Sequence, residues 1–487
     1  MERDLLATNR KALRINLNRN IYGTFAEIGG GQEVARNFFQ AGGASGTVAK
    51  SISAYDKLFS DNIYNKNKPG RYVSEHRLQK MLDTEYNGLI EVLAGKRHKE
   101  TCFFTFANTV AILNYNKDNE AHGWLGVRFQ IKPGSPENEV VLHVRLLEND
   151  SLLQQNTLGI LGVNLIFACF YYYEYPNTFL QSLLDNLSPD RLEVTMIRMK
   201  GPDLSYVDNR LLAVQLIKNG MAPAIVFDRY GSVQEPADML YKKNVLAFRG
   251  SFRPITYVGF DMLKTSYSIF KRDEDYEKEN TLALCEITIN NLLDEGELDE
   301  RDFLSRVDLL NGMGQNVMVS NFREYYKLVS YFSRFTIQNL RVVIGVPVFL
   351  NVLDKKYYEN LKGGILEALG KLFTDNMKLY VYPTVASVPV DDPEKGGPVL
   401  TSANLPLPDD LKDLYHYLKK NRKIIDIANA KKKWLYINSR RVLQLIQDGE
   451  KGWEKMVPRY IEDQIKSKGL FGYSAEKEKK KATRANK

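Results

Sequence analysis

The residue types and spacing that best suit chemistry in this chain form one short turn, made of Gly250, Ser251, Phe252, Arg253 and Pro254. An apolar run at residues 245–248 precedes the turn, and an amphipathic stretch follows it. This order predicts a strand, a glycine turn and a helix start, where backbone N–H groups without helical partners can hold a phosphate. We therefore expect a phosphate or nucleotide site here.

Each residue of this turn has an expected role. The N–H groups of Ser251 and Phe252 would face phosphate oxygens near the start of the helix. Arg249 and Arg253 flank the turn and are able to neutralise charge as bidentate donors. Thr256 stands close to the expected helix start, and we expect it to help position phosphates.

The sequence Gly-Ser-Phe-x-Pro resembles the first motif of the nucleotidylyl transferases, which adenylate nicotinate mononucleotide or phosphopantetheine. In that family the motif continues with a His or Thr, one spacer and then Gly-His. Here Thr256 is followed by one extra residue, and Phe260 stands where the motif has its histidine. The resemblance implies adenylyl transfer from ATP with Mg²⁺, in which that histidine stabilises charge at the α-phosphate. Phe260 cannot do so.

The glycine-rich N-terminal sequence and the β/α repeats also resemble those of an uncharacterised bacterial family. Some members of that family carry a nicotinate-nucleotide adenylyltransferase label. The second nucleotidylyl transferase motif, an Ile-Ser-Ser-Thr-x-x-Arg-like loop, has its nearest counterpart in position at residues 384–387. Three interpretations of the Gly250 turn stay open: an active nucleotidylyl transferase, a nucleotide site without that reaction, and a structural turn. The alternative function is a non-catalytic assembly or regulatory protein with a degenerate nucleotide site.

Two further segments have the composition of ligand sites. Asp228 follows an apolar run at residues 224–227, and open α/β sheets bind ligands where strands end. We expect Asp228 to contact a ligand hydroxyl or a metal. Glycines gather at 29–31 and again at 42–46 around an expected helix, which suits either an anion site or, as we favour, close helix packing. If an anion site existed, it would gather Glu27, Gln32, Glu33, Arg36 and Ser45.

Histidines and cysteines are sparse. None of the five histidines lies two to four residues from another, which excludes a simple local metal site. His122 and Arg128 flank Trp124 at an expected strand edge, and His143 shares a strand with Arg145. The three cysteines lie in apolar contexts, which predicts buried, reduced thiols.

The composition is that of a soluble globular protein. The chain has 487 residues, with 44% hydrophobic and 26% charged residues, so we expect two or three domains. No apolar leader opens the chain, and the most apolar stretch, residues 158–173, is shorter than the ~20 residues of a membrane-spanning helix. We expect a cytoplasmic protein that binds a small-molecule nucleotide and neither a membrane nor nucleic acid. Homo-oligomer formation is left open.

The alternation of apolar patterns predicts the fold. We expect an N-terminal α+β section at residues 1–150 with strands at 101–113, 126–131 and 140–147, the last two antiparallel. Helical spacing predicts a helix at 47–58, and the apolar run at 162–170 predicts a buried strand. Residues 151–390 then alternate strand and helix, which predicts a Rossmann-like α/β layered, mostly parallel sheet with helices on both faces. A helical extension at 391–474 and a disordered basic tail at 475–487 complete the expected organisation.

Overall fold

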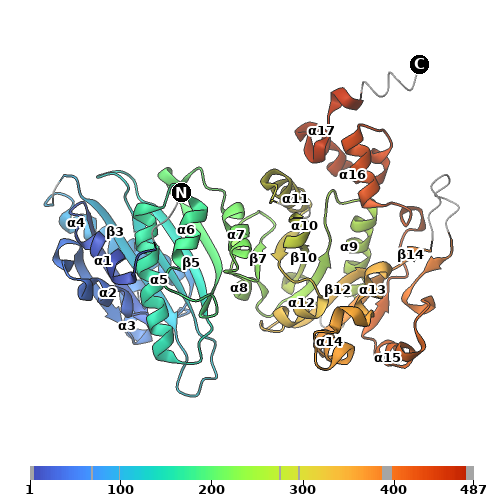
Figure 1. Ribbon diagram of the computed structural model, residues 1–487, viewed down its shortest axis with the longest axis horizontal. Coiled ribbons are helices and arrows are strands. Elements are labelled where there is room, and N and C mark those ends of the chain that lie inside the picture. The colour runs from blue at the N-terminus through green and yellow to red at the C-terminus, as the bar shows by residue number, and fades with distance from the viewer. Residues whose placement is uncertain are drawn as a thin grey trace. The chain divides into compact units, whose positions relative to one another are not determined.

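The computed structural model describes residues 5–66, 70–97, 99–273, 276–293, 297–386 and 397–478. The chain forms two compact units, Met1–Ile225 and Val226–Lys487 (Figure 1). The sequence suggests a boundary near residue 150, but strand β6 (Leu192–Lys200) pairs with β5 (Asn138–Leu146) in the first sheet. Because that pairing holds residues after 150 to the first sheet, the chain divides after Ile225 instead.

The first unit is built on a mixed six-stranded sheet in the order β2-β1-β3-β4-β5-β6. Its other strands are β1 (Ile21–Gly29), β2 (Val48–Ala54), β3 (Cys102–Ala111) and β4 (His122–Phe129). β1 runs parallel to β2 and β3, whereas β3, β4, β5 and β6 pair antiparallel in succession. The predicted antiparallel pairing of β4 with β5 is confirmed, and the unit has the expected α+β character.

Helices cover both faces of this sheet. Phe103 packs against Leu89 of α4, whereas its neighbour Phe104 packs against Phe170 of α5 with ring centroids 5.8 Å apart. Successive residues of a strand point to opposite faces, so α4 and α5 lie on opposite sides. The helices of this unit are α1 (Thr8–Asn16), α2 (Glu33–Ala41), α3 (Lys57–Asn65), α4 (Glu75–Leu93), α5 (Ser151–Tyr171), α6 (Pro176–Leu183) and α7 (Asn209–Lys218).

Two predictions of secondary structure in this unit are wrong. Residues 162–170 form the second half of α5 and not a strand, because a short apolar run is equally compatible with a helix buried on all sides. Residues 47–58 form β2 and the start of α3 and not one helix. Gly162 explains how α5 packs so tightly, since a Cβ atom there would meet Cγ2 of Val34 on α2 at 2.3 Å.

α5 is also the one helix in the described part of the chain that is long and apolar enough to cross a membrane. Yet 72% of its most apolar 18-residue window is buried inside the protein. It packs against α1, α2, α6 and β4. The packing of a core helix therefore accounts for its composition.

A buried ion pair fastens the N-terminal helix to this core. The ammonium of Lys11, on α1, lies 2.6 Å from Oδ2 of Asp185 and 2.8 Å from Oδ1 of Asn164 on α5. The two charged side chains are 0% and 2% exposed. Removing one partner of such a pair leaves an unpaired charge in an apolar interior.

Lys11→Ala should therefore lower the free energy of unfolding of the first unit by about 3–5 kcal/mol. Chemical denaturation of the full chain measures this change. The matched control is Arg36→Ala, which removes an ion pair to Glu33 from a side chain that is 62% exposed. The control should change little, because solvent screens exposed pairs. Equal losses in both variants would contradict the assignment.

The second unit is built on an eight-stranded sheet in the order β16-β13-β12-β9-β10-β11-β7-β8. Its strands are β7 (Ala224–Phe227), β8 (Val233–Gln234), β9 (Asn244–Arg249), β10 (Thr281–Thr288), β11 (Asn316–Ser320), β12 (Asn339–Gly345), β13 (Met377–Tyr382) and β16 (Ile424–Asp426). β9 to β13 and β16 pair in parallel, and β8 pairs antiparallel with β7. A separate small ribbon joins β14 (Thr384–Val385) and β15 (Val399–Leu400).

The order of these strands contains a reversal. From β9 the chain proceeds to β10 and β11 on one side, and then returns to β12, β13 and β16 on the other side of β9. Right-handed crossovers that proceed in opposite directions place their helices on opposite faces. The predicted mostly parallel α/β sheet with helices on both faces is confirmed (Figure 1).

The helices of this unit are α8 (Pro236–Leu240), α9 (Tyr257–Phe270), α10 (Ile289–Leu292), α11 (Glu300–Gly312), α12 (Tyr325–Phe332), α13 (Val346–Val352), α14 (Gly364–Leu372), α15 (Asp409–Lys420), α16 (Ser439–Asp448) and α17 (Arg459–Lys468). The expected helical extension also supplies β16, which the sequence did not indicate because the strand has only three residues. Of the predicted tail, residues 475–478 are helical and residues 479–487 lie outside the described residues.

Candidate functional site

The Gly250 turn lies at the point where the strand order of the second sheet reverses. It follows β9 directly, and the neighbouring parallel strand β12 belongs to the other half of the sheet. In open α/β sheets, ligands bind in the crevice outside the carboxyl ends of the strands at such a reversal. The turn therefore occupies the edge of the sheet where a ligand site is expected.

A cavity of about 380 Å³ opens at this turn, and we call it the Gly250 cavity. The turn contributes Gly250, Ser251, Phe252, Pro254 and Thr256 to its wall. The ends of β12 and β13 supply Gly345 and Tyr382, and the segment before α16 supplies Leu435 and Ile437. The cavity thus joins segments that are almost 200 residues apart in sequence.

Three helices begin at the Gly250 cavity. The first turn of α9 contributes Val258 and Gly259, the start of α13 contributes Pro347 and Val348, and α16 contributes its first residue, Ser439. The N-terminus of a helix carries unsatisfied N–H groups and a partial positive charge. Three such ends around one cavity favour an anionic group even where no free cation is present, although Asn438 already accepts from two N–H groups at the start of α16.

Two hydrogen bonds to residues outside the turn hold the Gly250 turn in place. Gly250 donates its N–H to the backbone carbonyl of Glu286 on β10 at 3.0 Å. The carbonyl of Ser251 accepts from Nη1 of the buried Arg306 at 3.2 Å. In a trans peptide the carbonyl and the next N–H point in opposite directions, so the N–H of Phe252 points away from Arg306. No described residue accepts a hydrogen bond from the N–H of Ser251 or Phe252.

Phe252 anchors the turn to the strand before it. Its ring is buried and packs edge-on against Phe248 of β9, with ring centroids 5.3 Å apart. Phe252 has a φ of +49°, an uncommon left-handed conformation for a residue with a side chain. A Cβ atom on Gly250 would meet the Phe252 ring at 3.0 Å, so glycine leaves room for that ring. Strained backbone held by packing is typical of functional turns.

The two arginines that flank the turn both form ion pairs with carboxylates. Arg249 forms a bidentate pair with Glu286, at 2.5 and 2.8 Å, and donates to the carbonyl of Arg323. Burial lowers the pKa of the Arg249 guanidinium, but the attraction of Glu286 outweighs it and raises that pKa above its usual range. Arg253 donates to Asp302 at 2.8 Å and does not line the Gly250 cavity. The expected neutralisation of phosphate by Arg249 and Arg253 is therefore largely lost to these partners.

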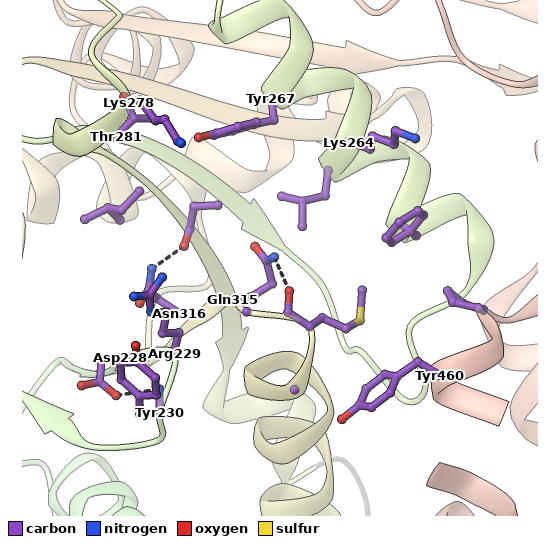
Figure 2. A pocket seen from close by; sticks show the side chains of 18 of the residues that line it. Asp228, Arg229, Tyr230, Lys264, Tyr267, Lys278, Thr281, Gln315, Asn316 and Tyr460 are labelled. Atoms are coloured by element: carbon purple, nitrogen blue, oxygen red, sulfur yellow. Dashed lines mark hydrogen bonds between the residues drawn. The ribbon is translucent and has the colours of Figure 1, made fainter. Parts of the chain in front are cut away.

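Asp228 lies at the other edge of the same sheet. It follows β7 but lines a larger cavity together with Thr281 and Asn316, the first residues of β10 and β11 (Figure 2). Its carboxylate accepts from the N–H groups of Tyr230 and Ser232 and from the side chain of Gln234. Asp228 therefore closes its own turn and is not brought together with Gly250, because β7 ends where β10 and β11 begin.

Phe260 also lines this larger cavity and not the Gly250 cavity. The position that corresponds to the family's histidine thus carries no proton donor and faces the other edge of the sheet. Among the described residues, the ionisable side chains in the wall of the Gly250 cavity are Arg249, Tyr325 and Tyr382, and burial raises the pKa of both tyrosine hydroxyls well above its usual range. The described residues contain no group of three or more His, Cys, Asp or Glu side chains able to hold a metal ion.

Two segments that are distant in sequence from the Gly250 turn also line the Gly250 cavity. Thr384, at the position expected for the second phosphate motif, does line the cavity, while Ser387 lies outside the described residues. The start of α16 lies there as well, and Asn438 caps it by accepting from the N–H groups of Arg440 and Arg441. The local signal was an asparagine before a helix, and only the fold brings it to the cavity.

The glycine-rich segment of the first unit holds an internal carboxylate. Glu27 on β1 is 2% exposed and accepts from the N–H groups of Val34 and Ala35 at 3.0 and 3.3 Å. Its carboxylate thus occupies the start of α2, where an external anion would bind. A Cβ atom on Gly31 would meet Oδ1 of Asn108 at 2.5 Å, so close packing accounts for this glycine.

The other residues expected near that segment serve local structure. Gln32 directly precedes α2, and Arg36 pairs with Glu33 at the surface. Ser45 lies in a short 3₁₀ turn. In the neighbouring strands, Nδ1 of His122 lies 2.9 Å from Nε2 of His143, a contact that follows from the register of β4 and β5.

The burial of Glu27 predicts a pH dependence of stability. Burial raises the pKa of Glu27 from 4.5 to about 8, although the two backbone N–H groups lower it in part. Between these values the folded chain holds a proton that the unfolded chain has released, so stability falls as the pH rises toward about 8.

Denaturation midpoints from about pH 5 to about pH 9 should therefore decline more steeply for the natural chain than for Glu27→Gln, which cannot ionise. The difference between the two proteins measures the contribution of Glu27, because other titrating groups are common to both. A difference that stays constant with pH would contradict the assignment.

Comparison with known proteins gives only remote likenesses. No protein-family model and no curated protein matches the sequence. Similar solved structures include the competence/damage inducible protein CihA from Agrobacterium tumefaciens, with 14% identity over 34% of this chain and 93% of that chain and a TM-score of 0.24. The competence or damage-inducible protein from Enterobacter asburiae has 9% identity over 33% and 95%, with a TM-score of 0.24.

The Plasmodium falciparum nicotinic acid mononucleotide adenylyltransferase, complexed with APC, is similar over 48% of this chain and 98% of that chain, with 15% identity and a TM-score of 0.29. All three TM-scores are low, so no function follows from these likenesses. The α/β class of the chain is established by its own strand order.

Proposed function

We propose that the second unit binds a nucleotide in the Gly250 cavity, with a phosphate at the Gly250 turn. The single observation that carries this proposal is the convergence of three helix N-termini on one cavity at the strand-order reversal of a parallel sheet. The N–H groups of Ser251 and Phe252 would serve as additional phosphate donors.

The rest of the cavity suits the base and sugar of a nucleotide. Phe252, Leu435 and Ile437 give it an apolar wall, while Ser251, Thr256 and Thr384 add hydroxyl groups. Small-molecule sites commonly combine such apolar walls with a few polar groups and occupy about 300–1,000 Å³. A cavity of about 380 Å³ has room for one nucleotide.

The same geometry favours binding over adenylyl transfer. That reaction brings ATP and a second substrate together and needs a donor at the α-phosphate. Of the described residues in the wall, Arg249 is the one cationic side chain and is paired with Glu286, and none is a histidine or lysine. Among the described residues the wall contains no carboxylate either, so these residues offer Mg²⁺ no ligand, and any Mg²⁺ would arrive on the phosphates of ATP. We therefore place this site with the non-catalytic alternative.

Filling the cavity tests the proposal. Val348 and Leu350 lie on the same helix and are both 36% exposed, but only Val348 lines the Gly250 cavity. Val348→Trp should weaken the binding of AMP, nicotinate mononucleotide or ATP about tenfold or more in calorimetric titration. Leu350→Trp should leave the affinity unchanged. Unchanged affinity in Val348→Trp, or no binding of these nucleotides to the natural chain, would refute the proposal.

Arg253→Ala separates binding from support of the turn. Because Arg253 pairs with Asp302 outside the cavity, its loss should lower the melting temperature and leave nucleotide affinity nearly unchanged. The melting temperature with and without nucleotide measures both effects, since a ligand stabilises the folded state it binds. Loss of nucleotide binding in this variant would contradict this prediction and would show that Arg253 contributes to nucleotide binding.

A further inference from the structure

The cavity at the amino edge of the second sheet is larger than the Gly250 cavity. We call it the amino-edge cavity; its volume is about 1090 Å³ and it shares no wall residue with the Gly250 cavity. The loop after β7, helix α9, the ends of β10, β11 and α11, and the segment that begins α17 enclose it (Figure 2). It is therefore a separate place for a ligand.

Cationic side chains from three elements surround the amino-edge cavity. Arg229 belongs to the loop after β7, Lys264 to α9 and Lys278 to the 3₁₀ turn before β10. All three are exposed, and none forms an ion pair with another described residue. Like charges repel one another, so their gathering around one cavity creates a positive potential that attracts anions.

The acidic residues of this cavity do not cancel that charge. Asp228 already accepts three hydrogen bonds within its own turn. Glu279 is exposed, and with Asp228 it sets two negative charges against the three positive ones. The described side chains of the wall thus carry one positive charge in excess.

Aromatic rings accompany the cations. Tyr230 is 77% exposed, and the Arg229 guanidinium lies 5.0 Å from the centre of its ring. In Figure 2, Arg229 and Tyr230 lie at the lower left of the cavity, Lys278 and Tyr267 at the top, and Tyr460 at the lower right. An exposed tyrosine beside an arginine offers a stacking surface for a planar ring and a donor for phosphate.

Tyr460 closes the cavity on the side of α11. A Cβ atom on Gly312, the last residue of α11, would meet the hydroxyl of Tyr460 at 1.8 Å. Glycine at 312 therefore allows the start of α17 to form a wall. The volume that results exceeds the usual upper range of about 1,000 Å³ for small-molecule sites, which is ample for a nucleotide.

We propose that the amino-edge cavity is a second ligand site, which binds a nucleoside phosphate. The base rests against Tyr230, and the phosphates lie among Arg229, Lys264 and Lys278. Cationic side chains hold the phosphates at this edge, whereas helix N-termini serve the Gly250 cavity at the other. The second site does not depend on the first.

ADP titrated into the full chain carrying Val348→Trp tests the second site with the Gly250 cavity filled. We expect one ADP to bind, with an affinity that falls as salt is added. Adding Arg229→Ala and Lys278→Ala should weaken this binding about tenfold or more. The charge-matched control, Lys362→Ala with Lys420→Ala, removes exposed lysines that line neither cavity and should not weaken it.

Two further comparisons identify the ligand class. Adenosine and inorganic phosphate should each bind much more weakly than ADP, because each lacks one half of the contacts. Tyr230→Ala should weaken ADP binding, whereas Tyr417→Ala, which removes a tyrosine that is 65% exposed and lines neither cavity, should not.

The proposal is overturned if the Val348→Trp chain does not bind ADP, or if the Arg229 and Lys278 variant binds ADP as well as its control. Inorganic phosphate binding as tightly as ADP would also overturn the assignment to a nucleoside. These outcomes differ from failure at the Gly250 cavity, in which case the natural chain and Val348→Trp would bind the same number of nucleotides with the same affinity.

Discussion

The buried carboxylate of Glu286 is the constraint on which the functional edge of the second sheet depends. It is 0% exposed on β10, and it binds Arg249 at the end of β9 and the hydroxyl of Ser320 at the end of β11. A charge in such a place is tolerated only when it is paired and hydrogen-bonded. Its backbone carbonyl also receives the N–H of Gly250. Glu286 thus fixes where the Gly250 turn begins. It also forms the ion pair with Arg249 that keeps this side chain from binding a phosphate.

Helix α9 connects the two edges of that sheet. Its first turn, with Val258 and Gly259, lines the Gly250 cavity, while Leu263 and Lys264 line the amino-edge cavity. The two cavities offer positive potential by different means. At the Gly250 cavity it comes from backbone dipoles, which cannot move or titrate. At the amino-edge cavity it comes from exposed side chains, whose effect is screened by salt.

The first unit shows the opposite solution at a helix start. There the carboxyl group of Glu27 supplies the hydrogen-bond acceptors from within the chain, although burial raises its pKa to about 8. Sequence pattern alone cannot distinguish this arrangement from an open anion site, because both have a glycine-rich turn before a helix. The side chain that occupies the site comes from the strand before the turn. Its direction is set by the pairing of β1 with β3, which the local sequence does not show.

The sequence by itself determined the alternation of strands and helices in the second unit and the strand, turn and helix around Gly250, because apolar periodicity and glycine act over a few residues. It did not determine that residues 162–170 are helical, since a short run that is apolar throughout suits both structures. Only the tertiary structure decided the partners of Arg249 and Arg253, which lie 37 and 49 residues away. The tertiary structure also places the start of α16 at the Gly250 cavity and Asp228 at the amino-edge cavity. Strand order and register set these contacts, and they arise from the packing of the whole sheet.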